Sequence, residues 1–108
     1  FIGITRESEG NSMVERLEFD HWDKELPIAL EKIGRNAVSE FDINSVVIAH
    51  RTGVVLPSEP IVCIHVASPH RVAGFAACSW IMDELKSQAP LWKKEVTTEG
   101  ESWKSGLG

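Results

Sequence analysis

A short stretch beginning at Ser68 combines a helix start with two side chains that bind anions. Ser68 suits the N-cap of a helix and Pro69 suits its first turn, which puts His70 and Arg71 at the helix N-terminus. Free backbone N–H groups and the positive end of the helix dipole attract anions there, and the two side chains add further donors. The sequence therefore predicts a small anion site, against the alternative of an ordinary capped helix with a surface arginine.

Lys86 and Lys93 form a second basic cluster, on either side of Pro90. Lys86 follows Met82 by one helical turn, and Lys93 lies on the strand expected after Pro90, from which it could point back towards Lys86. Two amines in one partly dehydrated pocket lower each other's pKa. A lysine in that state can act as a general acid or base or as a nucleophile, whereas the alternative is two ordinary surface lysines.

The two clusters are too far apart to share a small substrate within one chain. Positions 70 and 86 are 16 residues apart on one helix, which corresponds to about 24 Å along an α-helix. The helix is also apolar on almost every side, so one sheet would not cover it. Both observations predict a homodimer in which the start of one helix approaches the end of the other.

Hydrophobic periodicity predicts the elements that position these residues. Their order is strand, strand, helix, strand, strand, helix, strand, which argues for an α+β fold with both helices packed on a mainly antiparallel or mixed sheet. The expected strands are residues 1–6, 13–20, 45–51, 60–67 and 91–96, and the helices run from an N-cap at Asp23 to about Phe41 and from Ser68 to about Ser87. Since residues 61–67 are apolar on both faces, that strand should be central in its sheet.

Length and composition favour one domain spanning residues 1–108. The chain is 43% hydrophobic with a formal net charge of −5, so it should form a core and bind nucleic acid poorly. Residues 1–42 hold ten acids and five bases, while the remainder holds six of each. The chain begins at Phe1 inside an apolar stretch, from which we expect that some N-terminal sequence is missing. Because it has no signal-peptide pattern and no run of about 20 apolar residues, we expect a cytoplasmic protein.

Metal and thiol chemistry have little support in the sequence. The four histidines lack the i, i+4 spacing of a helical metal site, and two cysteines cannot form a four-cysteine zinc site. Cys63 and Cys78 fall among apolar residues in a strand and a helix, where thiols usually act as small hydrophobic groups. The sequence therefore predicts no metal site and no permanently bound cofactor.

Several separate motifs together resemble the large, catalytic subunit of molybdopterin synthase. The matching blocks span nearly the whole chain: Phe1-x-Gly3-x-x-Arg6, His50-Arg51-x-Gly53, Ser68-Pro69-His70-Arg71, Met82-Asp83-Glu84-Leu85-Lys86, Ala89-Pro90-Leu91-Trp92-Lys93-Lys94-Glu95 and Glu99-Gly100-x-x-Trp103. The resemblance implies an α/β-hammerhead fold with an added antiparallel subdomain. One departure is Ser58, which stands where family members commonly have glycine.

The resemblance also implies an activity and partners. The family converts cyclic pyranopterin monophosphate into molybdopterin by adding two sulfurs, which form the dithiolene that holds molybdenum. Sulfur arrives as a thiocarboxylate on the C-terminal Gly-Gly of a small ubiquitin-like subunit, whose tail enters a pocket of the large subunit. The large subunits form a homodimer with a small subunit at each end, which makes a heterotetramer.

The resemblance gives individual residues their expected roles. Lys86 would be the main catalytic residue, as a proton donor and acceptor during sulfur attack, and Lys93 would assist it or hold the acyl tail. Residues implied in substrate binding are Arg6, His70, Arg71, Phe1 and Met82. Of these, His70 and Arg71 would come from the neighbouring chain. The alternative is a noncatalytic module that binds an anion or the extended tail of a partner.

Overall fold

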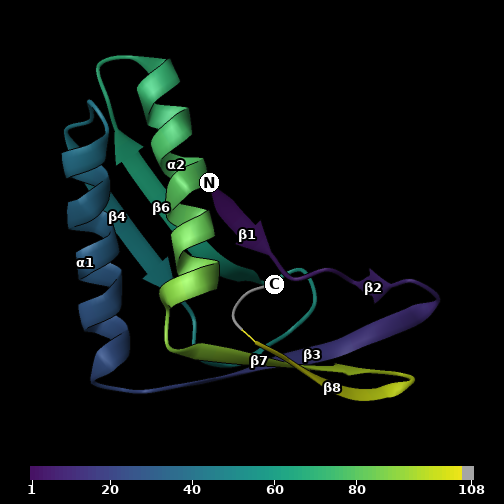
Figure 1. Ribbon diagram of the computed structural model, residues 1–108. Coiled ribbons are helices and arrows are strands. Elements are labelled where there is room, and N and C mark those ends of the chain that lie inside the picture. Colours follow the sequence, from purple (N-terminus) through teal and green to yellow (C-terminus); the bar gives the residue numbers. More distant parts are fainter. Residues whose placement is uncertain (106–108) are drawn as a thin grey trace.

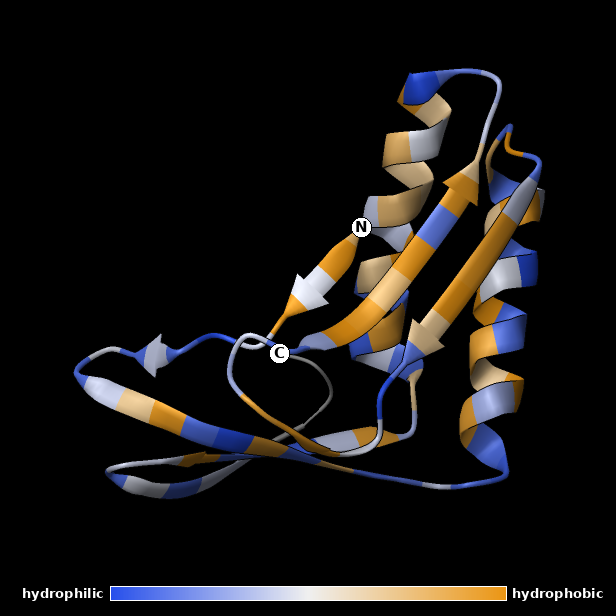
Figure 2. Cartoon of the chain, turned by 180° about the vertical axis from the view of Figure 1, so that it is seen from behind, coloured by the Kyte–Doolittle hydropathy of each residue, from blue (hydrophilic) through white to orange (hydrophobic). Residues whose placement is uncertain are grey.

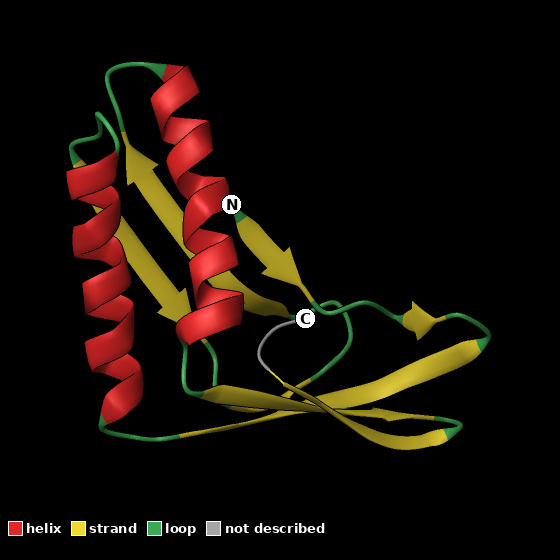
Figure 3. Ribbon diagram, viewed as in Figure 1, coloured by secondary structure: helices red, strands yellow, loops and turns green. Residues whose placement is uncertain are grey.

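Two β-sheets and two helices make up the chain, as seen in a computed structural model that describes residues 1–105 (Figures 1 and 3). In chain order the elements are β1 (Ile2–Ile4), β2 (Ser8–Glu9), β3 (Ser12–His21), α1 (Glu25–Glu40), β4 (Ser45–His50), β5 (Gly53–Val55), β6 (Pro60–Ala67), α2 (Arg71–Gln88), β7 (Leu91–Thr97) and β8 (Gly100–Ser105). Neither helix in this part of the chain has the length and apolar character needed to span a membrane.

The first sheet has three antiparallel strands in the order β1-β6-β4. Both helices cover one face of it, and the main core lies between the layers (Figure 1). Buried residues of this core are Ile33, Ala37, Ile43, Val62, Ile64, Ala77, Ile81 and Leu85. The opposite face carries no helix and is partly apolar, with Ile2 and Val47 exposed (Figure 2). The predicted central position of residues 60–67 is confirmed, because β6 pairs on both sides.

The second sheet is built around the long strand β3, which pairs with β2, β5 and β7. Strand β7 in turn pairs with β8, and all of these pairings are antiparallel. This sheet extends away from the ends of the helices (Figures 1 and 3). A smaller core lies on it, made by Val14, Leu17, Phe19, Leu26, Val55 and Leu91. The register matters for function, since it places Phe19 of β3 directly opposite Lys93 of β7.

The predicted α+β class is confirmed, but the sequence pattern missed three strands. Strand β2 has only two residues and β5 only three, too few for an alternating pattern to appear. Strand β8 contains charged and polar residues that read as a loop, and it exists because it pairs with β7. Both helices lie on one antiparallel sheet, as predicted, and the remaining strands form a second sheet.

Both helices begin later than predicted. Helix α2 starts at Arg71 with His70 at the N-cap, rather than with Ser68 there. The Ser68 hydroxyl instead accepts a hydrogen bond from the backbone N–H of His70, at 3.3 Å, and so shapes the turn before the helix. Helix α1 starts at Glu25, one residue further from Asp23 than an N-cap would be. The predicted cap residues therefore lie in the turns, and neither N-cap side chain makes a capping hydrogen bond.

Ser58, the residue that departs from the family's glycine, has a left-handed backbone with φ of 68°. Such a conformation carries no penalty for glycine but is unfavourable for other residues. Two hydrogen bonds hold Ser58 there: its N–H donates to the carbonyl of Thr5 at 2.9 Å, and its hydroxyl donates to Glu7 at 2.8 Å. The family preference at this position thus has a physical reason, and in this chain the serine side chain contributes a contact that glycine lacks.

Alanine at Gly3 should destabilise the fold, whereas alanine at Gly34 should stabilise it. A Cβ at Gly3 would lie 2.8 Å from Val62 Cγ1 in the core, which is closer than carbon atoms pack. A Cβ at Gly34, within α1, would lie 3.8 Å from Val46, an ordinary contact. We expect the free energy of unfolding to fall by about 1–3 kcal/mol for Gly3→Ala and to rise by about 0.5–1 kcal/mol for Gly34→Ala. Urea unfolding measures both, and equal effects would contradict the close approach at Gly3.

Candidate active site

A cavity of about 210 Å³ lies where the C-terminal half of α2 meets β1 and the second sheet. Lys86 enters it from the last turn of α2 and Lys93 enters it from β7. Phe1 and Met82 also line this cavity. It therefore brings together four of the residues singled out from the sequence, and both lysines face one concave space.

The two lysines of this cavity differ in exposure. The side chain of Lys86 is exposed in the last turn of the helix, where a cation interacts favourably with the helix dipole. Lys93 is only 8% exposed, and Glu95, two residues further along the same strand face, is 5% exposed. An exposed amine can exchange protons with solvent and ligands, while a buried one is held in place by its surroundings. The pair thus combines an exposed and a buried lysine side chain.

A second, more polar cavity of about 170 Å³ adjoins the first. Arg6 and Lys93 line it together with Glu9 and Glu95, so its walls carry charges of both signs. Lys93 lines both cavities, and the guanidinium of Arg6 lies 3.1 Å from the carboxylate of Glu9. Because this ion pair is exposed, it contributes little to stability. Arg6 is therefore positioned next to the lysine pocket and is able to exchange its carboxylate partner for an anionic ligand.

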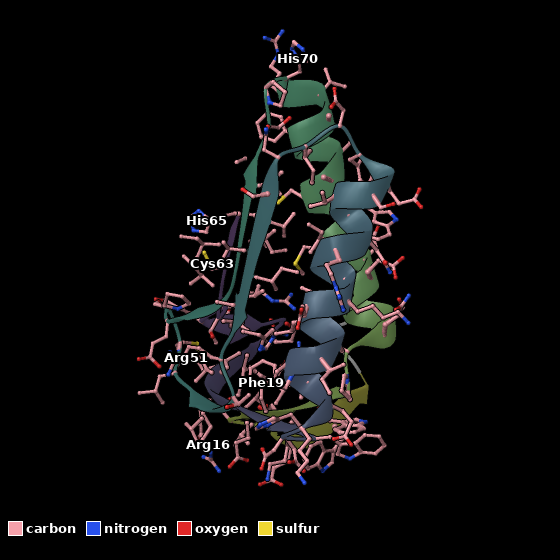
Figure 4. The ribbon with its side chains drawn as sticks, turned by 90° about the vertical axis from the view of Figure 1, so that its left-hand side faces the viewer. Arg16, Phe19, Arg51, Cys63, His65 and His70 are labelled. Carbon is pink, nitrogen blue, oxygen red and sulfur yellow. The ribbon has the colours of Figure 1, made fainter. Side chains whose placement is uncertain are left out.

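His70 and Arg71 lie at the other end of α2, far from the lysine pocket. They line a separate cavity of about 230 Å³. Figure 4 shows His70 at one end of the molecule and Phe19, which lines the lysine pocket, towards the other. Since α2 is a continuous helix from Arg71 to Gln88, the separation expected from the sequence is preserved. Within one chain, the two predicted clusters are not brought together.

An apolar cavity of about 470 Å³ lies between these two ends. Phe75, Cys78 and Met82 line it from α2, and Phe1 lines it from the N-terminal end of the chain. Phe1 also lines both the lysine pocket and the cavity beside His70. The outward side of α2 therefore carries a row of three adjoining hollows, with cationic residues at each end and apolar residues in the middle.

Lys94 belongs to a different part of the surface from its neighbour Lys93. Successive side chains of a strand point to opposite faces, and Lys94 contacts Glu18 at 2.7 Å and Glu101 at 3.7 Å. Its hydrogen bond to Glu18 raises the pKa of Lys94, and the same bond lowers the pKa of Glu18. Lys94 therefore lies outside the pocket that Lys93 lines.

The sequence missed pocket residues that belong to the strands. Phe19 of β3 lines the lysine pocket, as do Ile61 and Val62 of β6. Behind Phe19, the ring of His50 makes an edge-on contact at a centroid distance of 5.1 Å. Burial lowers the pKa of His50, whose Nδ1 donates to the carbonyl of Arg51 at 2.6 Å. A neutral imidazole therefore supports this wall, and the alternation of Leu17, Phe19 and His21 was the signal that could have identified it.

Comparisons with known proteins agree on one family. The family model described as "MoaE protein" matches residues 1–88. A molybdopterin synthase catalytic subunit of Ralstonia nicotianae is 42% identical over 95% of this chain, and one of Pyrococcus abyssi is 37% identical over 98%. This chain spans 58% of the length of the first relative and 72% of the second. The crystal structure of molybdopterin synthase from Staphylococcus aureus superposes with a TM-score of 0.86 at 31% identity, covering 96% of this chain and 76% of that one.

Proposed function

The chain belongs to the MoaE protein family, and from this we propose that it is the catalytic subunit of a molybdopterin synthase. It would transfer sulfur from the thiocarboxylated C-terminus of a small ubiquitin-like subunit to cyclic pyranopterin monophosphate, forming the dithiolene of molybdopterin. Support comes from relatives that carry the name molybdopterin synthase catalytic subunit over nearly all of this chain. We further propose that it acts in the cytoplasm.

The observation that carries this proposal is the shared pocket of Lys86 and Lys93. Both the substrate phosphate and a thiocarboxylate are anions, so ammonium groups that face one cavity favour binding of the two together. Lys86, the exposed amine, would donate and accept protons as sulfur attacks the pterin. Lys93, buried and fixed on β7, would hold the acyl end of the tail. Phe1 and Met82 would form the apolar wall beside them.

Completion of this site requires a second copy of the chain. His70 and Arg71 bear the groups best suited to the substrate phosphate, yet they lie at the opposite end of α2 from Lys86. In a homodimer, these two residues of one copy would face the lysine pocket of the other. Arg6, beside Lys93, would contribute the remaining cation from the same chain. Each dimer would then bind two small subunits, one at each pocket.

Reconstitution with a sulfur carrier tests the proposed function. We expect a small protein ending in Gly-Gly, loaded as the thiocarboxylate, to bind this chain and to yield molybdopterin when cyclic pyranopterin monophosphate is added. The carrier with an ordinary carboxylate is the control, and it should bind without yielding product. Binding of the loaded carrier without any sulfur transfer would instead favour the alternative, a noncatalytic module that binds an anion or a peptide tail.

A further inference from the structure

A groove with a volume of about 650 Å³ lies between α1 and β4. The two elements lie side by side at one edge of the first sheet, while β1 forms its other edge (Figures 1 and 2). Apolar residues of both elements line the groove, namely Pro27, Leu30, Gly34, Val38, Val46 and Ile48. Because the groove and the lysine pocket are lined by different residues, the groove is a separate feature of the surface.

One side of this groove is the unpaired backbone of β4, which pairs only with β6 in the part of the chain that the structure describes. Ile64 of β6 lies opposite Ile48, but its N–H donates to the carbonyl of Phe1 at 2.8 Å and its carbonyl accepts from the amine of Phe1 at 2.9 Å. Ile48 and Ile64 therefore form a non-hydrogen-bonded pair, and the alternation of an antiparallel ladder gives Val46 the same position. The N–H and C=O groups of Val46 and Ile48 thus point to the free edge.

Strand β4 also lacks the features that usually keep an exposed strand edge from pairing. Protected edges are very short, carry charged residues or proline, or are interrupted by a bulge. The edge strands β1, β2 and β5 have only two or three residues each, and β8 carries the acidic residue Glu101. Strand β4 has six residues and contains no proline, lysine, arginine or acidic residue. Its edge is therefore suited to accept a further strand.

We propose that the groove binds an extended, basic segment of another protein, which adds to β4 as an antiparallel strand. The N–H and C=O groups of Val46 and Ile48 would pair with its backbone, and alternate side chains of the segment would enter the groove beside α1. Gly34 of α1 keeps this space open, since a Cβ there would lie 3.8 Å from Val46 Cγ1. Glycine is unfavourable inside a helix, so its presence at this position favours a binding role for the groove.

The charge at one end of the groove specifies a basic partner. Helix α1 ends there without a basic residue in its last turn, so the negative end of its dipole is not offset. Glu40 and Asp42 are exposed in the same part of the chain, just before Asn44, which lines the groove. Along the wall, Glu31 and Arg35 form an exposed ion pair at 4.0 Å and largely offset each other. Because β4 begins at this end, an antiparallel segment would carry its basic residues towards its own C-terminus.

Amide hydrogen exchange with a synthetic peptide tests the pairing. The probe is acetyl-Thr-Val-Thr-Val-Arg-Arg-amide, and the control peptide has two glutamates in place of the arginines. At saturation, we expect the basic peptide to slow exchange about 10-fold at the amides of Val46 and Ile48. The amide of Val47 should be unchanged, because it already faces β6. The acidic peptide should bind about 10-fold more weakly. No binding of the basic peptide, equal binding of both, or protection only at other amides would overturn the proposal.

Two lysine substitutions locate the peptide on the surface. Val38→Lys adds a cation at the acidic end of the groove and should weaken binding of the basic peptide about 10-fold. Val47→Lys makes the same change at an exposed position on the other face of the sheet and should alter binding by less than about twofold.

Equal losses in the two variants would overturn the proposal. So would an assembly of the chain with itself that Val38→Lys abolishes while the peptide fails to bind, which would indicate pairing of β4 with a second copy. None of these measurements uses sulfur transfer, so the outcome does not depend on the proposed function.

Discussion

Lys86→Ala should lower the rate of sulfur transfer by about 10²–10⁴-fold, the range for loss of a general acid–base group. Lys86 lines the pocket from the last turn of α2, where its side chain is exposed, and we propose it as the proton donor. The fold should be unaffected, because the side chain is exposed and alanine is a good helix former. Single-turnover formation of molybdopterin from the loaded carrier measures the rate, and thermal unfolding verifies the fold.

Two matched variants separate proton transfer from simple loss of charge. Lys86→Arg keeps a cation at the pocket but replaces a titratable amine with a guanidinium that stays protonated. We therefore expect Lys86→Arg to bind the carrier as the unaltered chain does, but to transfer sulfur as slowly as Lys86→Ala. Lys94→Ala removes another lysine, which lies outside the pocket and pairs with Glu18, so its rate should match that of the unaltered chain. Sulfur transfer at full rate by Lys86→Ala would refute the catalytic role of this residue.

The convergence of Lys86 and Lys93 was predictable because only local geometry was needed. Pro90 ends α2 soon after Lys86, and the short connection to β7 turns the chain back on itself. Lys93 then points into the same pocket if its side chain lies on the face of β7 that is turned towards Lys86. Lys94 has the same charge and adjoins it in sequence, but the alternation of strand β7 turns it to the other face, towards Glu18. Composition alone does not distinguish these two lysines, whereas the register of β3 with β7 does.

The walls of the pocket and the two-sheet architecture depend on contacts between distant residues. Phe19 lines the pocket only because β3 pairs with β7, a pairing that the sequence pattern does not specify. Strands β5 and β8 are too short or too polar to be recognised locally, and each exists through a partner strand. Arg71, not Ser68, begins α2, since the Ser68 hydroxyl is used in the preceding turn. Strand pairing between distant residues and the geometry of turns therefore could not be predicted from the local sequence pattern.

Co-expression of Lys86→Ala chains with Arg71→Ala chains should restore about a quarter of the unaltered turnover if chains pair at random. Lys86→Ala alone should be nearly inactive, and Arg71→Ala alone should lose about 10–100-fold through the missing charged hydrogen bonds. Half of the dimers in the mixture contain one chain of each kind. In such a dimer, one site lacks both residues, and the other has both because it takes Lys86 from one chain and Arg71 from the second.

A mixture of Lys86→Ala and Lys93→Ala chains is the matched control, and it should restore nothing. These lysines line the same cavity of a single chain, so in a mixed dimer each site lacks one of them. Sites contained within one chain would give no restoration in either mixture, because every chain would carry a defect. If only the mixture of Lys86→Ala and Arg71→Ala chains regains turnover, Arg71 must act on the pocket of the neighbouring chain. The fraction of turnover regained then equals the fraction of sites that have both residues.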